Sequence, residues 1–232
     1  MPYRRLPTTD AARIRALQAA TERADQLELT KLAYSTRYIH PIRNFLQQLQ
    51  SEKFQQEQSR KQVINQNKEH QKKLLRAKLY LSHFIQVLNM CIARDEFQTE
   101  TRQFYGLDES DIRLPPLQTE EQVMRWGKLI IDGETKRIRM GGAPIMNPTL
   151  GKVRVWYERF KESYHSQQTA NKSYKRSTAQ LTDLRRKIDA LLQAVWNDVE
   201  DYYSMLSIDE AHANCSEYGL VYVYRRNEKR SS

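Results

Sequence analysis

The sequence has few of the residues that interrupt helices, with only 7 glycines and 7 prolines in 232 residues. Residues 42–105 contain neither type, and residues 152–218 contain neither type. Glycine and proline are the strongest local breakers of helical structure, and all-β folds need many of them in turns. Their scarcity excludes an all-β fold and predicts two long helical segments, 41–105 and 148–205.

Cysteine is rarer still, since the chain has only Cys91 and Cys215. Two cysteines are too few for a disulfide scaffold, and no histidines stand at metal-ligand spacing, so we expect no metal and no cofactor. The chain also lacks an apolar run long enough to cross a bilayer, and no apolar stretch follows the arginines near its start. We therefore expect a cytoplasmic protein with reduced thiols and no membrane contact.

Both long segments contain apolar residues at alternating spacings of three and four, which is typical of helices packed at shallow angles, as in coiled coils. The spacing passes through Leu46, Leu49, Leu81, Phe84, Leu88, Val153, Phe160, Leu184, Ile188 and Val195. Only residues 105–147 connect the segments, and an antiparallel pair needs far less of that connection stretched out than a parallel pair. The sequence predicts an all-α fold with two long antiparallel, coiled-coil-like helices and shorter capping helices.

Two features of the long segments leave alternatives open. Their middles, 55–68 and 164–178, are polar, and a turn in each would give a compact bundle of helical hairpins instead. When the first long segment is shifted by 107 residues onto the second, Pro41 falls on Pro148 and many of the regularly spaced apolar residues coincide. This match indicates an internal repeat. The alternative is a chance alignment, because any two segments with the same apolar spacing can be matched by choosing a shift.

The remaining sequence completes a single helical domain, 1–232. We expect N-terminal helices in 1–40, a loop and connecting helix in 106–147, and an extended arm in 206–232. Thr119 followed by Gln122 has the pattern of a capping box that starts the connecting helix. The stretch "GGAPIMNPTLG" at 141–151 lacks the spacing of a phosphate loop, so we interpret it as a hinge. In that hinge the glycines end one helix, and Asn147 with Pro148 starts the next.

Positive charge is concentrated toward the N-terminal end, where residues 1–78 hold 16 Lys and Arg against 7 Asp and Glu. Two segments, 53–78 and 172–187, have net charges of +6 and +5. A basic helix face of this kind suits contact with nucleic-acid phosphates, although it is also the composition of an ordinary solvated face. The predicted nucleic-acid or anion contacts are Arg60, Lys61, Lys68, Lys72, Lys73, Arg76, Lys172, Lys175, Arg176, Arg185 and Arg186.

No set of residues with catalytic spacing can be named from the sequence. The members of a Ser–His–Asp arrangement lie far apart in a chain, so an enzymatic site stays open as an alternative. The chain has two long apolar packing faces and no recognisable set of catalytic residues. This combination favours a non-enzymatic scaffold or interaction module that binds another protein or itself. Nucleic-acid binding through 53–78 and 172–187 is the alternative.

Four stretches carry a resemblance to a known group of sequences: "MPYRRLPTTDAARIRAL", "LYLSHFIQVLNMCIARDE", "GGAPIMNPTLGKV" and "EYGLVYVYRR". Over most of its length the chain resembles an uncharacterised family of helical proteins from Bacteroides-type bacteria. The resemblance implies a bacterial cytoplasmic protein, and it implies no activity, substrate, cofactor or functional residue.

Overall fold

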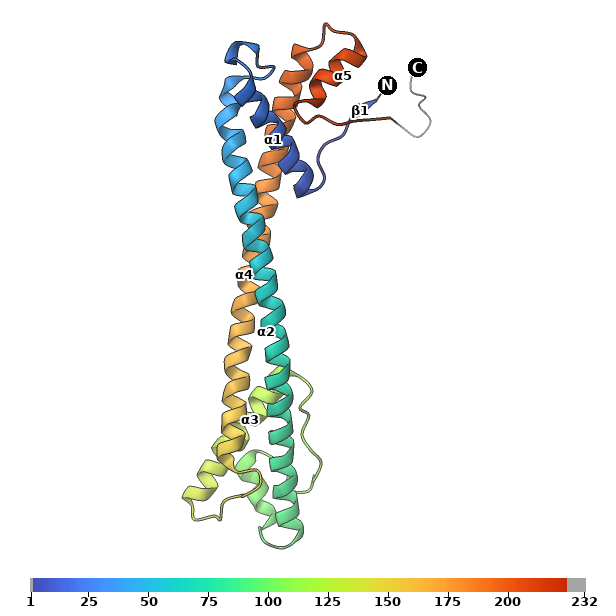
Figure 1. Ribbon diagram of the computed structural model, residues 1–232. Helices are drawn as coiled ribbons and strands as arrows, with labels where there is room; N and C mark the ends of the chain where they lie inside the picture. Colours follow the sequence, from blue (N-terminus) through green and yellow to red (C-terminus); the bar gives the residue numbers. More distant parts are fainter. Residues whose placement is uncertain (1, 225–232) are drawn as a thin grey trace. The chain divides into compact units, whose positions relative to one another are not determined.

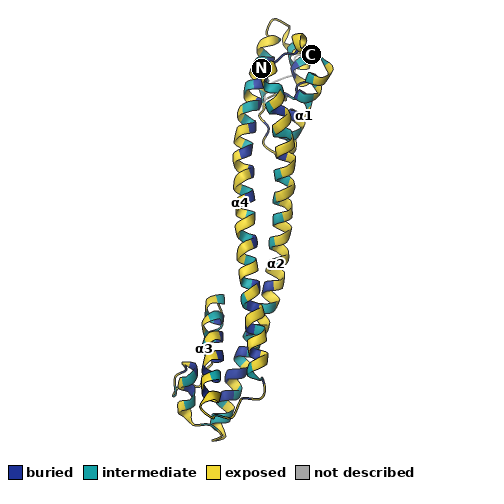
Figure 2. Cartoon of the chain, turned by 90° about the vertical axis from the view of Figure 1, so that its left-hand side faces the viewer, coloured by how far each residue is buried: buried dark blue, intermediate teal, exposed yellow. Residues whose placement is uncertain are grey.

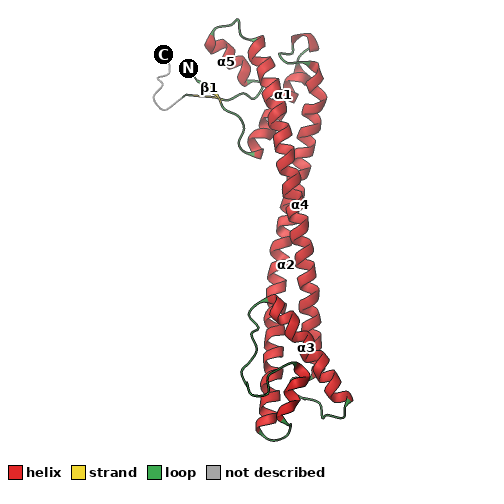
Figure 3. Ribbon diagram, turned by 180° about the vertical axis from the view of Figure 1, so that it is seen from behind, coloured by secondary structure: helices red, strands yellow, loops and turns green. Residues whose placement is uncertain are grey.

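The computed structural model describes residues 2–224 and is all-α apart from two short strands (Figures 1 and 3). Its two longest helices are α2 (Ile39–Ala93) and α4 (Leu150–Tyr202). Both run without interruption through the polar stretches 55–68 and 164–178. The predicted pair of long helices is therefore confirmed, and the alternative of helical hairpins is wrong.

The chain divides into two compact units, one formed by residues 1–60 with 173–232 and the other by residues 61–172. We call them unit 1 and unit 2. Each unit contains part of α2 and part of α4, and the buried residues of the two helices lie mainly where the helices face each other (Figure 2).

In unit 1, the start of α2 packs against the end of α4. Leu49 of α2 and Ile188 and Val195 of α4 are all fully buried in one core, as the antiparallel pairing predicts. The core is completed by α1 (Asp10–Gln26), α5 (Ile208–Ser216) and residues 32–34, which connect two short 3-10 helices, η1 (Leu29–Lys31) and η2 (Thr36–Tyr38).

Unit 1 also contains a two-stranded antiparallel sheet made from opposite ends of the sequence. Strand β1 (Tyr3–Arg4) pairs with β2 (Tyr222–Val223), and Tyr3 lies opposite Val223. The predicted extended arm is thus a strand at 222–223, and β1 is the partner that so short a strand needs. The arginines that follow in the sequence lie outside the described residues.

In unit 2, the end of α2 packs against the start of α4, with Leu81, Phe84 and Leu88 in one core with Val153 and Phe160. The connection between the long helices adds the 3-10 helix η3 (Thr99–Tyr105) and helix α3 (Glu120–Arg139).

Helix α3 begins as the sequence predicted. Thr119 accepts a hydrogen bond from the backbone N–H of Gln122, and the Gln122 side chain accepts one from the backbone N–H of Thr119. This reciprocal pair is the capping box. Helix α3 ends at Arg139, and Gly141 follows with φ of +91°, a conformation in which glycine ends helices.

Three predicted boundaries are wrong. Helix α2 ends at Ala93 and does not reach 105, because Asp95 adopts the left-handed conformation (φ of +59°) without any glycine. Helix α4 begins at Leu150, after Thr149 whose hydroxyl accepts from the backbone N–H of Lys152. Asn147 and Pro148 form a turn with a cis peptide bond in front of it. The arm 206–232 contains helix α5, which Ser207 and Glu210 start with a capping box.

Candidate interaction surface

The predicted basic residues of unit 2 lie mainly on the solvent side of α2. Lys61, Lys68, Lys72 and Arg76 are exposed and spaced by seven, four and four residues, so they share one face of the helix. Among the described residues only Lys72 of these has a carboxylate partner, Glu69, at 2.8 Å. Lys73 is half-buried, and Lys172 is exposed on α4. Four of the predicted contact residues therefore form a basic row on one face of α2.

In unit 1 the predicted basic residues divide into two groups. Arg60, Lys175, Arg176 and Arg186 are exposed to solvent. Arg185 is half-buried, and its guanidinium donates to both carboxylate oxygens of Asp10 in α1.

Two ion pairs connect α1 to α4 in unit 1. The Arg185 guanidinium nitrogens lie 2.7 and 2.6 Å from the two carboxylate oxygens of Asp10, and Arg13 of α1 makes the same kind of pair with Asp189 of α4. The hydrogen bonds from Arg185 lower the pKa of the Asp10 carboxyl, although its partial burial opposes that shift. Arg185 therefore attaches α1 to α4, and it is less suited to bind a nucleic acid than its exposed neighbours.

Large apolar side chains lie on the same face of α2, within the basic row and beyond it toward the end of the helix. Leu75, Leu79 and Met90 are 64%, 41% and 53% exposed, and their spacing of four and eleven residues keeps them on the side of Lys68 and Lys72. Single exposed apolar residues are common on proteins, but a group of them on one face marks an interaction site.

The loop 106–118 adds two more apolar side chains beside α2. The Asn89 side chain donates to the Ile112 carbonyl oxygen at 2.8 Å, and Lys78 donates to the Gln118 carbonyl oxygen at 2.6 Å, so α2 holds the loop at both places. Ile112 is 72% exposed and Leu114 is 41% exposed.

A buried arginine fixes the shape of this loop. Arg102 is 1% exposed, and its guanidinium donates to the carbonyl oxygens of Asp108 and Asp111 and to the Asn89 side chain. Sequence reasoning missed this residue, since backbone carbonyls leave no signal in a sequence. The loop is thus held in one position from inside the unit.

We call the combined area the α2–loop surface. It consists of the basic residues Lys61, Lys68, Lys72 and Arg76 and the apolar residues Leu75, Leu79, Met90, Ile112 and Leu114.

The residues most like a catalytic set are Glu120, His70 and Ser163, which the sequence did not reveal. His70 is fully buried, with Nδ1 3.0 Å from Ser163 Oγ and Nε2 2.8 Å from Glu120 Oε1. Ser163 is 2% exposed and donates its hydroxyl proton to the Phe160 carbonyl oxygen at 2.7 Å. The rings of Phe160 and Tyr164 pack against the imidazole.

A nucleophilic serine must give its proton to the imidazole and must be reached by a substrate. Ser163 does neither in this arrangement, because its proton points to its own helix and its side chain is enclosed. The group resembles a buried polar layer between helices, which fixes their register in coiled coils.

The chain matches no protein-family model, and neither curated proteins nor solved structures include a match to it. Within residues 2–224, no three His, Cys, Asp or Glu residues are grouped so that they could hold a metal ion. No helix in this described part is both long and apolar enough to cross a membrane. Function is therefore inferred from the residues of the chain itself.

Proposed function

We propose that the protein is a non-enzymatic interaction module, and that its α2–loop surface binds an acidic, amphipathic segment of another protein. The observation that carries the proposal is the placement of exposed leucines next to a basic row on one helix face. Water solvates lysines without difficulty, but Leu75 and Leu79 gain free energy only when something covers them.

Charge decides between the possible occupants of this surface. Lys61, Lys68 and Arg76 have no carboxylate partner among the described residues, so the surface stays positive. A second copy of the same surface would bring like charges together, which costs free energy. A helical segment with leucines on one face and glutamates beside them would satisfy both the apolar and the basic part.

The test is direct binding of a fluorescently labelled, amphipathic helical peptide that carries Glu and Leu. We expect Leu75→Ser with Leu79→Ser, and separately Lys68→Glu with Lys72→Glu, to weaken binding by about tenfold or more. The matched controls are Val155→Ser, an exposed apolar residue on α4, and a peptide in which Lys replaces every Glu. The proposal is wrong if the Lys peptide binds equally well or if the leucine variants bind like the wild type.

Nucleic-acid binding is the second candidate, and the exposed lysines and arginines on α2 and α4 support it. Binding of duplex and single-stranded oligonucleotides, measured over a range of salt concentrations, separates the two functions. Phosphate contact gives a steep fall of affinity with salt and is indifferent to Leu75 and Leu79. Tight oligonucleotide binding that the leucine variants retain would replace the first proposal by the second.

A further inference from the structure

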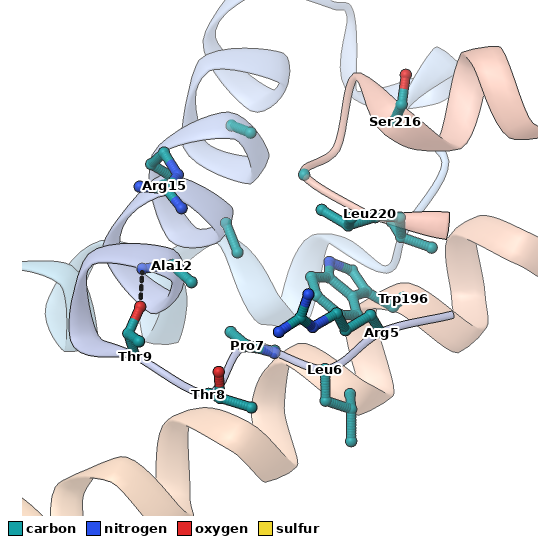
Figure 4. Close-up of a pocket in the computed structure, with 14 residues that line it drawn as sticks. Arg5, Leu6, Pro7, Thr8, Thr9, Ala12, Arg15, Trp196, Ser216 and Leu220 are labelled. Atoms are coloured by element: carbon teal, nitrogen blue, oxygen red, sulfur yellow. Dashed lines mark hydrogen bonds between the residues drawn. The ribbon is translucent and has the colours of Figure 1, made fainter. Parts of the chain in front are cut away.

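Unit 1 contains a pocket of about 470 Å³ that is separate from the α2–loop surface (Figure 4). Residues 5–9 form one side, α1 forms the second, and residues 219–221 with Trp196 of α4 complete it. The volume lies in the range of pockets that hold small molecules. The pocket is formed within one unit, so its geometry depends on the packing of that unit alone.

The pocket walls are mainly apolar. Pro7 and Leu220 are buried, Leu6 is half-exposed at the edge, and Ala16 contributes a small side chain from α1. The backbone N–H of Arg5 donates to the Val221 carbonyl oxygen at 2.8 Å, which holds the N-terminal segment against the C-terminal one. An occupant would therefore place an apolar body between the two segments and α1.

The Trp196 side chain supplies a donor at this site that no described residue uses. Trp196 is 1% exposed, and its Nε1–H has no hydrogen-bond acceptor among residues 2–224. Figure 4 shows the indole between the N-terminal segment and Leu220, with its nitrogen on the side of Leu220. Buried donors nearly always have an acceptor, so an indole N–H without one beside a pocket points to an acceptor on a ligand.

The charged groups of the pocket are all positive. Arg5 and Arg15 are the charged lining residues, and no carboxylate lies within ion-pair distance of either in the described chain. Figure 4 shows the Arg5 guanidinium near the middle of the lining residues, while Arg15 points outward from α1. Both arginines are exposed to solvent, so the pocket offers two unpaired guanidinium groups at its open side, both suited to an anionic group.

We propose that this pocket binds an amphipathic carboxylate, a small molecule with an apolar body and one carboxylate head. The head pairs with Arg5 and accepts the hydrogen bond of Trp196 Nε1–H, while the apolar body packs against Pro7 and Leu220. Two donors match the two oxygens of a carboxylate, and the absence of acidic lining residues favours an anionic head.

The experiment follows the indole N–H signals of the three tryptophans by two-dimensional 15N NMR, with the Trp196 signal assigned from Trp196→Phe. The probe is decanoate below its micelle concentration, compared with decanol and with acetate. We expect decanoate to shift the Trp196 signal in a saturable way and to leave those of Trp126 and Trp156 in place. Decanol tests the need for the charge, and acetate tests the need for the apolar body.

Two pairs of variants distinguish the site from nonspecific binding. Arg5→Gln removes the guanidinium and should weaken decanoate binding by about tenfold or more. Arg176→Gln, an exposed arginine of the same unit outside the pocket, should leave binding unchanged. Ala12→Leu fills the pocket from α1 and should abolish binding, whereas Ala11→Leu on the exposed side of α1 should not.

Because Trp126 and Trp156 lie in unit 2, the folding of unit 1 in each variant is checked separately, by a urea titration followed by far-ultraviolet circular dichroism. The proposal fails if decanoate leaves the Trp196 signal in place, or if Arg5→Gln and Ala12→Leu bind like their controls. Equal binding of decanol would overturn the assignment of a carboxylate, and equal binding of acetate would overturn the assignment of an apolar body.

Discussion

Substitution of Gly133 by alanine should destabilise unit 2, although alanine is the better helix former. Gly133 lies within α3, where alanine in place of glycine normally adds about 1 kcal/mol of stability. A Cβ atom at this position would lie 2.2 Å from the Phe104 carbonyl oxygen and 2.8 Å from its carbonyl carbon. Both atoms belong to the backbone of η3, so no side-chain rotation relieves the collision.

The free-energy cost of the collision exceeds the stability that alanine adds as a helix former. Overpacking a well-packed site costs about 1–3 kcal/mol, and a collision with backbone belongs at the upper end because α3 and η3 must separate. After subtraction of the helix-propensity gain, Gly133→Ala should lower the free energy of unfolding by about 1–2 kcal/mol. The measurement is a urea titration followed by far-ultraviolet circular dichroism.

Gly151→Ala is the matched control, because Gly151 lies in the first turn of α4 with only the Thr149 hydroxyl nearby, at 3.9 Å. This substitution should leave the protein equally stable or make it more stable by up to about 1 kcal/mol. If Gly133→Ala were as stable as Gly151→Ala, the close approach of α3 and η3 would be refuted.

Two further substitutions test the charged and polar contacts of the two units. Arg185 lowers the pKa of Asp10, so this carboxylate contributes stability above its unfolded pKa of about 3.9 and loses it as the pH falls through the folded value. Asp10→Asn should therefore lower the free energy of unfolding by about 1–2 kcal/mol near pH 7 and by progressively less as the pH falls through the folded pKa of Asp10. An equal loss at neutral and acidic pH in urea titrations would contradict the ion pair. Thr119→Ala removes the capping box with Gln122 and should cost about 1 kcal/mol by the same titration, whereas Thr169→Ala, exposed in the middle of α4, should cost clearly less.

The long helices could be predicted because their evidence is local and repeated. The absence of glycine and proline and the seam through Leu81, Phe84 and Leu88 both extend over many turns, so no single residue decides the result. The end of α2 depended instead on one residue, Asp95, which takes a left-handed conformation more readily than most. Helix α5 also has a local sequence signal, the capping-box pattern of Ser207 followed three residues later by Glu210.

The internal repeat stays a prediction. Pro41 is the third residue of α2, whereas Pro148 lies in the turn before α4, so the two prolines occupy different places relative to their helices. The equivalence that the shift by 107 residues suggested is therefore not supported at these positions.

The functional surfaces were harder to predict because they depend on contacts between distant segments. The basic row on α2 could be read from the sequence, but the exposure of Leu75 and Leu79 follows from which face of α2 the neighbouring helices leave open. The His70 group needs the antiparallel register, which brings Ser163 within reach from the other long helix. The unused donor of Trp196 is visible only when every possible acceptor around it has been placed.

The pairing of β1 with β2 has a consequence for the synthesis of the chain. Unit 2 is continuous in the sequence, so all of its residues have been synthesised once residue 172 has been added. Unit 1 includes Trp196 and Tyr222, so its first 60 residues cannot complete their native packing until these later residues have been synthesised. At ordinary rates of translation that delay is on the order of ten seconds. During it the apolar side of α1 has no native partner from α4.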